Sequence, residues 1–116
     1  MKVSEESTLE TIEAPWGWHK ILEKNPLYMV KMLFMNEGHR CSLQYHEEKI
    51  ETIIVARGTL QVEIDDEIYV LHENDDITIN NRALHRMTGL TDCYYIECST
   101  PFEDDVIRVE DDYGRV

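Results

Sequence analysis

Four polar side chains in this sequence have the types and the spacing that a metal ion requires. Residues 38–51 read GHRCSLQYHEEKIE, in which Gln44 and His46 are two residues apart and Glu51 follows five residues later. A second histidine, His85, lies in the short stretch ALHRM. Two imidazoles with two side-chain oxygens suit a borderline or hard divalent ion such as zinc, manganese, iron, cobalt or nickel. The sequence therefore points to a metal site, provided that the fold brings these side chains together.

The segment before Glu51 has one polar and one apolar face. If residues 40–46 are extended, alternate side chains point to opposite sides. The polar side then holds Arg40, Ser42, Gln44 and His46, and the apolar side holds Cys41, Leu43 and Tyr45. We expect the polar side, with Arg40, to face a lumen. The apolar side needs a cover, which an N-terminal arm or the first strand of the chain would supply.

Glu51 and His85 are each in phase with apolar residues. Glu51 shares its strand face with Ile53 and Val55, and His85 shares its strand face with Ala83 and Met87. A charge that points into a core is expensive unless it is paired or bound to a metal. The alternative is that His46 and Glu51 are exposed near a hairpin and that His85 is a satisfied core histidine, because one bulge shifts the phase of a strand.

The rest of the chain reads as a series of short strands. Apolar or alternating runs separated by Asn, Asp and Gly predict an all-β sandwich or barrel. The expected strands are 27–35, 41–46, 51–58, 59–64, 68–71, 75–80, 83–87 and 93–98, with turns at Arg57-Gly58 and Asp65-Asp66. The tail FEDDVIRVEDDYG is compatible with a helical turn or with a final strand.

Length and composition limit the classes of protein to consider. The chain has 116 residues, enough for one domain, which we place at 14–116 after a flexible acidic arm at 1–13. The net charge of −13 argues against nucleic acid or an anionic membrane as a partner. Three cysteines (Cys41, Cys93 and Cys98), the lack of an apolar signal region and the lack of a long apolar run predict a cytoplasmic protein.

The spacing of the four polar residues resembles the first cupin motif, G-x5-H-x-H-x3-4-E-x6-G. Here the motif runs from Gly38 to Gly58, with Gln44 in place of its first histidine. The second motif, G-x5-P-x-G-x2-H, is kept only at His85, while Asn74, Asn80 and Arg82 stand at its Gly, Pro and Gly positions. Cupins are jelly-roll barrels, or double-stranded β-helices, and are commonly dimers. The resemblance implies a single-domain, all-β cupin that holds one divalent metal ion, with zinc the first choice, on Gln44, His46, Glu51 and His85.

Four stretches are similar to the C-terminal cupin of type II phosphomannose isomerases. They are APWGWHKILEK (14–24), GHRCSLQYH (38–46), LHRM (84–87) and VEDDYGR (109–115). Those enzymes are often fused to a mannose-1-phosphate guanylyltransferase, whose Gly-rich nucleotide-binding start has no counterpart here. The resemblance implies a homodimer that interconverts the sugar phosphates mannose 6-phosphate and fructose 6-phosphate through an enediol, with the metal as Lewis acid.

Catalytic roles fall on Arg40 as a phosphate ligand and on Lys49, near the mouth of the site, as a proton-transfer group. Glu48 and the acidic run 110–112 are further candidates for the base, although a solvated tail is the simpler interpretation of that run. The family often continues His-His-Arg-x-Glu-His-Trp after the position of His46, where this chain reads EEKIETI. This departure keeps two alternatives open: a metal-binding cupin of another kind (a dioxygenase, or a small-molecule binding or regulatory module), and a structural cupin without a functional metal.

Overall fold

The computed structural model describes residues 10–116, and within that range the chain forms β-strands and no helix. The strands are β1 (Thr11–Ala14), β2 (Gly17–Lys24), β3 (Met29–Met35), β4 (Leu43–Tyr45), β5 (Glu51–Arg57), β6 (Leu60–Ile64), β7 (Glu67–Leu71), β8 (Asp76–Ile79), β9 (His85–Gly89), β10 (Cys93–Ser99) and β11 (Ile107–Glu110). The prediction of an all-β domain is confirmed.

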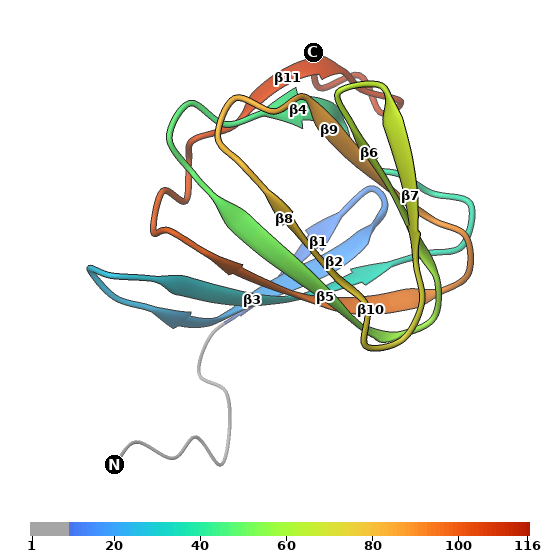
Figure 1. Cartoon of the computed structure of the whole chain (residues 1–116), viewed down its shortest axis with the longest axis horizontal. Helices are drawn as coiled ribbons and strands as arrows, with labels where there is room; N and C mark the ends of the chain where they lie inside the picture. The colour runs from blue at the N-terminus through green and yellow to red at the C-terminus, as the bar shows by residue number, and fades with distance from the viewer. Residues whose placement is uncertain (1–9) are drawn as a thin grey trace.

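The strands form two antiparallel sheets that face each other across the interior (Figure 1). One sheet has the order β1-β2-β3-β10-β5-β8, and the other has the order β11-β4-β9-β6-β7. Strand β10 lies between β3 and β5, which are far from it in the sequence, so the chain crosses repeatedly between the sheets as a jelly roll does. The C-terminal strand β11 reaches the edge of the smaller sheet by pairing with β4.

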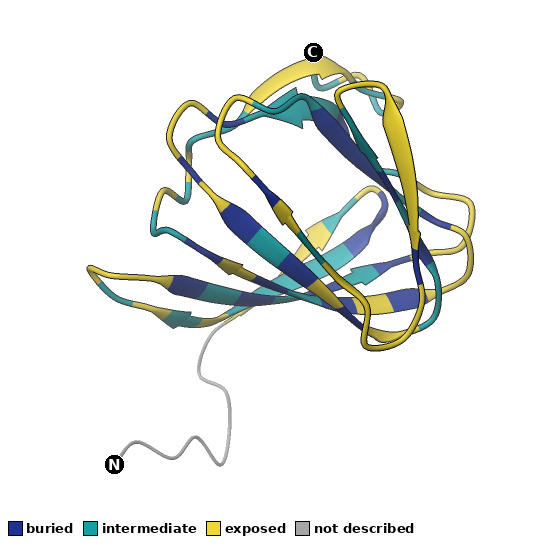
Figure 2. Cartoon of the chain, viewed as in Figure 1, coloured by how far each residue is buried: buried dark blue, intermediate teal, exposed yellow. Residues whose placement is uncertain are grey.

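Alternation along the strands places apolar side chains between the sheets. Ile53 and Val55 of β5, Leu60 and Val62 of β6 and Tyr95 of β10 are all completely buried. Figure 2 shows the resulting succession of buried and exposed positions along β5 and β10. Burying an aliphatic side chain of this size stabilises the fold by about 1.5–3 kcal/mol. The alternation of apolar and polar residues that predicted the strands therefore also places the apolar side chains in the core.

Two predicted boundaries differ from the structure. Residues 11–13, which we had placed in the flexible arm, belong to β1 and pair with β2, while residues 1–9 lie outside the described residues. Strand β2 was not predicted, because most of its side chains are half-buried and its sequence shows no clean alternation. In the tail, the choice between a helical turn and a strand is decided for a strand by the pairing of β11 with β4.

The turn at Asp65-Asp66 is confirmed. Both residues have positive φ, 46° and 72°, and Ile64 pairs directly with Glu67 across them. Two central residues with positive φ characterise the two-residue hairpin that matches the twist of antiparallel strands. Asp tolerates this conformation better than most residues do, which explains why an Asp-Asp pair connects β6 to β7.

Cys41 lies on the opposite side from the one we predicted. It is buried in the hydrophobic core, and its amide donates to the carbonyl of Met87. Residues 41–42 are not part of a strand, and β4 begins only at Leu43, so the alternation expected over 40–46 is interrupted. Cys41 therefore does not belong to the apolar outer face that we expected it to form with Leu43 and Tyr45.

Gly58 and Gly38 offer a matched pair of substitutions. Both have positive φ, but a Cβ on Gly58 would lie 2.2 Å from the carbonyl oxygen of Asp92, while a Cβ on Gly38 would meet nothing within 4 Å. We expect Gly38→Ala to lower the free energy of unfolding by about 1 kcal/mol through backbone strain alone. Gly58→Ala should lower it by about 3 kcal/mol, because overpacking is added to the strain. Urea unfolding of the two variants measures the difference, and equal losses would contradict the steric argument.

Within the described residues, no helix is long and apolar enough to cross a membrane. The homodimer and the cytoplasmic location remain predictions.

Candidate metal centre and its cavity

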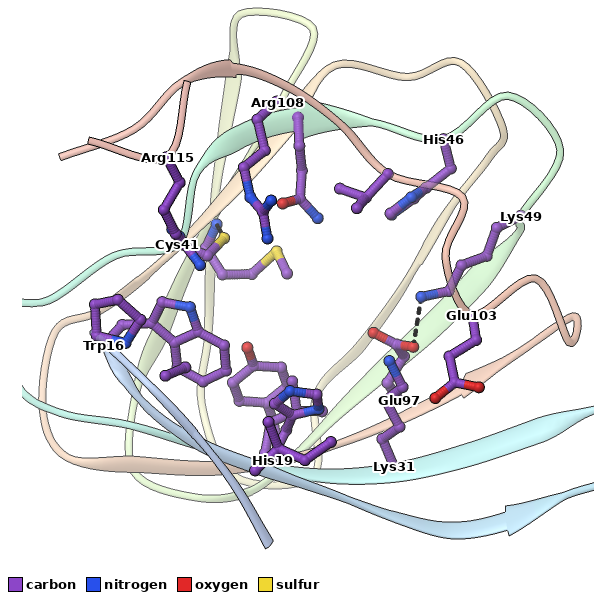
Figure 3. A pocket seen from close by; sticks show the side chains of 18 of the residues that line it. Trp16, His19, Lys31, Cys41, His46, Lys49, Glu97, Glu103, Arg108 and Arg115 are labelled. Atoms are coloured by element: carbon purple, nitrogen blue, oxygen red, sulfur yellow. Dashed lines mark hydrogen bonds and ion pairs between the residues drawn. The ribbon is translucent and has the colours of Figure 1, made fainter. Parts of the chain in front are cut away.

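A cavity of about 420 Å³ opens between the two sheets. Gln44 and His46 line it from the smaller sheet and the loop that follows β4, and Lys31 and Glu97 line it from the larger sheet. Figure 3 shows Arg108 and Arg115 reaching into the cavity on one side, with Lys31 and Glu97 opposite. The cavity is thus bordered by charged groups within a core that is otherwise apolar.

Three of the four predicted ligands converge at the wall of this cavity. One ligand atom from each of His46, Glu51 and His85 lies within 4.8 Å of the other two. Glu51 Oε1 is 3.1 Å from His85 Nε2 and 3.7 Å from His46 Nε2. All three side chains are buried, and none of these three atoms makes a hydrogen bond of normal geometry. The alternative in which His46 and Glu51 are exposed is therefore wrong.

The second nitrogen of each histidine fixes how its ring faces the cluster. The Nδ1–H of His85 donates to the carbonyl oxygen of Ala83 at 2.9 Å, and that of His46 donates to the carbonyl oxygen of Asp105. A histidine whose Nδ1 carries the proton presents a lone pair at Nε2. Backbone acceptors behind metal-binding histidines commonly hold the ring in this way. Both Nε2 atoms are thus oriented as ligands toward Glu51.

In the absence of a metal, the ionisable side chains of this cluster shift one another's pKa values. Burial would raise the pKa of Glu51, but His46, His85 and Lys49 outweigh it and hold that pKa well below its ordinary value. Burial would likewise lower the pKa of His85, whereas its contact with Glu51 raises it. Both shifts show that the fold favours an ionised Glu51 facing positive charge. A divalent cation supplies such charge, and two imidazoles with a carboxylate fit the borderline divalent ions.

Gln44 lies beside the three converging residues, and no direct contact joins it to them. It is the cross-strand partner of His85, and it lines the cavity. Its Oε1 accepts a hydrogen bond from the hydroxyl of Ser42 at 2.6 Å. A carbonyl oxygen has two lone pairs, so this bond leaves one free. Gln44 as a fourth ligand stays a prediction.

Lys49 lies inside the cavity wall and is not a free base at its mouth. Its Nζ is 2.8 Å from Glu97 Oε2 and 3.4 Å from Glu51 Oε2, and all three side chains are buried. Burial would lower the pKa of Lys49, but the charges of Glu97 and Glu51 outweigh it and raise that pKa. A lysine held in its protonated form cannot accept a proton, so its role here is to balance two buried carboxylates.

Arg40 is not among the residues that line the cavity, contrary to our expectation. Its guanidinium donates two hydrogen bonds to Asp112, at 2.6 and 2.9 Å, and the side chain is partly exposed. The interruption of the strand at residues 41–42 separates the phase of Arg40 from that of Gln44. The positions that we had expected Arg40 to occupy are taken instead by Arg108 and Arg115.

Sequence reasoning missed Lys31 and Glu97, although a local signal was present. Lys31 is in phase with the buried Met29 and Leu33, and Glu97 is in phase with the buried Tyr95. A charged residue in phase with buried apolar neighbours is the same signal that identified Glu51. The two residues are direct cross-strand partners between β3 and β10. Burial and the negative charge of Glu51 raise the pKa of Glu97 to about 7, and burial lowers the pKa of Lys31.

The acidic tail is tied to the barrel, contrary to its interpretation as a solvated run. Asp111 is a half-buried residue whose carboxylate is covered by its partner, and it accepts hydrogen bonds from the guanidinium of Arg115 at 2.8 and 2.9 Å. Arg115 holds the pKa of Asp111 down, from its ordinary 3.8 to about 2. Asp112 is held by Arg40. The end of the chain thus closes one side of the cavity.

We expect Arg115→Gln to lower the free energy of unfolding at neutral pH by about 1 kcal/mol, because it removes the charged partner of a half-buried carboxylate that solvent can partly screen. An acid whose pKa is depressed in the folded state stabilises the fold above its unfolded pKa, and this contribution disappears as the pH falls through the folded pKa. The stability difference between the two proteins should therefore shrink between pH 3.8 and about 2. Urea unfolding at several pH values measures it, and a constant difference would contradict the pair.

Comparison with known proteins gives one family and several relatives. Residues 2–111 match the family described as mannose-6-phosphate isomerase C-terminal. A mannose-1-phosphate guanylyltransferase of Sinorhizobium fredii is 35% identical over 107 residues, which cover 88% of this chain and 21% of the relative. The alginate biosynthesis protein AlgA of Pseudomonas aeruginosa is 36% identical over 106 residues, with 87% and 22% covered. The chain spans about a fifth of the length of these curated relatives.

Solved structures confirm the cupin fold. An RmlC-like cupin from Shewanella frigidimarina superposes with a TM-score of 0.76 at 19% identity, covering 90% of this chain and 92% of that one. KdgF from a Halomonas species superposes with a TM-score of 0.77 at 23% identity, covering 89% and 94%. At these identities the likeness concerns the fold alone.

The relatives overturn the predicted reaction. We expected an isomerase that interconverts mannose 6-phosphate and fructose 6-phosphate, but relatives from several organisms are named for guanylyl transfer to mannose 1-phosphate or for alginate and xanthan biosynthesis. The family description carries the isomerase name, whereas none of these relatives does. Two structural findings agree with the correction: Arg40 is bound to Asp112, and Lys49 is paired with the buried Glu97 and Glu51.

Proposed function

Because this chain belongs to the mannose-6-phosphate isomerase C-terminal family, we propose that it is a cupin domain that holds one divalent metal ion on His46, Glu51 and His85 and binds a small carbohydrate beside it. The observation that carries the proposal is the convergence of two imidazole nitrogens and one carboxylate oxygen, all buried and without other hydrogen bonds. Buried polar atoms of this kind are rare unless something occupies the space between them.

The cavity beside the cluster has the size and the lining of a small-molecule site. Its volume of about 420 Å³ falls in the range in which small ligands are held. Trp16 and Tyr95 provide aromatic surface, and Gln44 and His46 provide polar groups. The relatives' names refer to mannose 1-phosphate, alginate and xanthan, which favours a carbohydrate as the ligand.

Each residue of the site has a distinct task in this proposal. His46 and His85 are held by backbone carbonyls, so their rings need little reorganisation to bind the ion. Lys49 joins Glu51 to Glu97 and keeps both carboxylates in place. When bound, a divalent ion polarises a hydroxyl or carbonyl oxygen of the ligand as a Lewis acid.

Metal titration tests the proposal. Protein stripped with a chelator should bind about one equivalent of Zn²⁺ or Co²⁺ by calorimetry, and Co²⁺ should give the visible absorption of a site with nitrogen and oxygen ligands. Binding to the folded state alone should also raise the melting temperature. Absence of binding at millimolar metal would refute the metal site. It would favour the second candidate, a structural cluster in which Lys49 alone balances Glu51 and Glu97.

A further inference from the structure

Arg108 lies in one row with the proposed metal ligands. In the smaller sheet, Arg108 of β11 is the direct partner of Gln44 in β4, and Gln44 is the direct partner of His85 in β9. Directly opposite residues of an antiparallel sheet point to the same face and lie about 5 Å apart. The side chain of Arg108 therefore points to the cavity side of the sheet, two strands away from His85, where it lines the cavity and stays exposed to solvent. Figure 3 shows its guanidinium inside the cavity.

The other positive charges that line the cavity already face negative groups. Lys49 is paired with Glu97 and Glu51, and Arg115 is paired with Asp111. Lys31 is the cross-strand partner of Glu97 and is attracted by its charge. The side chain of Arg108, by contrast, makes no hydrogen bond or ion pair with any group of residues 10–116. In a chain of net charge −13, an unpaired guanidinium that points into a cavity is a binding group for an anion.

The hydroxyl of Tyr95 is a second, independent indication of a ligand. Tyr95 lines the same cavity, is completely buried, and its hydroxyl has no hydrogen-bond partner among the described residues. Burial raises its pKa well above the ordinary value, so the hydroxyl keeps its proton and is a donor. A buried donor without an acceptor costs free energy, which a ligand oxygen would restore.

We propose that Arg108 binds a carboxylate of the ligand, so that the domain recognises a sugar acid, with its hydroxyl groups toward the metal and the Tyr95 hydroxyl. One unpaired guanidinium matches one negative charge, and its planar fork matches the two oxygens of a carboxylate. Glu13 also lines the cavity, and its charge would repel a dianionic phosphate more strongly than a carboxylate with a single charge. This inference rests on the proposed metal and carbohydrate site and adds the chemical class of its ligand.

Three probes test the inference: gluconate, sorbitol, which has the same carbon chain with an alcohol in place of the carboxylate, and inorganic phosphate. Each is titrated into Zn²⁺-loaded protein, and binding is followed by calorimetry and by the tryptophan fluorescence, to which Trp16 in the cavity lining contributes beside Trp18. We expect gluconate to bind at least about tenfold more tightly than sorbitol, because of the charged hydrogen bonds to Arg108. In Arg108→Gln this preference should disappear, while the affinity for Zn²⁺ stays unchanged.

Arg57→Gln is the matched control, because Arg57 is exposed at the end of β5 and lies outside the cavity lining. It should keep the preference for gluconate. The inference is overturned if Arg108→Gln keeps the preference, if neither polyol ligand binds, or if phosphate binds more tightly than gluconate. A protein that binds no metal refutes the proposed function instead. The gluconate and sorbitol titrations are then read on metal-free protein, in which equal affinities refute the role of Arg108 separately.

Discussion

Replacing His85 with alanine is expected to weaken the binding of Zn²⁺ or Co²⁺ at least about a hundredfold, since it removes one of the three proposed protein ligands. His85 is completely buried, and its Nε2 lies 3.1 Å from Glu51 Oε1. Competition with a coloured chelator gives the affinity. His72→Ala is the matched control, because His72 is exposed and lies outside the cluster; it should bind metal as the unmodified protein does.

A loss of folding must be separated from a loss of metal binding in this experiment. The melting temperature of the stripped His85→Ala protein reports the folding effect alone, and the rise of that temperature on adding Zn²⁺ reports binding. His85→Gln keeps a polar side chain of similar length, and we expect it to fold more stably than His85→Ala while still binding weakly. Wild-type affinity for Zn²⁺ in both variants would refute the proposed metal site.

The second large effect is expected at Lys49. Lys49→Ala should lower the free energy of unfolding of the metal-free protein by about 3–5 kcal/mol, because Glu51 and Glu97 remain buried without their shared cation. The reciprocal change tests the mechanism: the double variant Lys49→Met with Glu97→Gln removes one charge of each sign and should recover a large part of the loss. Urea unfolding of the three proteins measures both quantities.

An exposed ion pair provides the control for Lys49. Lys24 pairs with Glu103 at the surface, where both side chains are partly exposed. Lys24→Ala should change the free energy of unfolding by less than about 1 kcal/mol, since solvent screens such pairs. If Lys49→Ala cost no more than Lys24→Ala, the buried cluster would not depend on the lysine. Addition of Zn²⁺ should reduce the cost of Lys49→Ala, because the ion supplies positive charge to Glu51.

Most of the fold could be predicted from local pattern. The strands from β3 to β10 have apolar residues in alternation, and the turn at Asp65-Asp66 follows from residues that tolerate positive φ. The edge strands β1 and β11, and β2 next to β1, lack that alternation, because most of their side chains are exposed or only half-buried. They are strands because neighbouring strands offer hydrogen bonds to their backbones, which no local pattern reveals.

The site shows even more clearly than the fold which features the sequence pattern predicts and which depend on the tertiary structure. Side-chain type and strand phase correctly predicted that His46, Glu51 and His85 point inward, and the spacing of the family motif agreed with that choice. The same reasoning applied to Arg40 was wrong, because residues 41–42 leave the strand and Asp112 binds the guanidinium. Arg108, which lies over 60 residues later in the chain, occupies the cavity because β11 pairs with β4 in one particular register.

The sequence by itself determined that this is an acidic all-β domain with inward-pointing histidine and glutamate side chains. The tertiary structure decided which of these side chains meet, that Lys31, Lys49 and Glu97 share one buried charge network, and which arginine reaches the cavity. The physical reason is that alternation is a property of a single strand, whereas distances between strands depend on register and on the closure of the barrel. Register is set by the sum of many pairings along the chain, so no single segment of the sequence contains it.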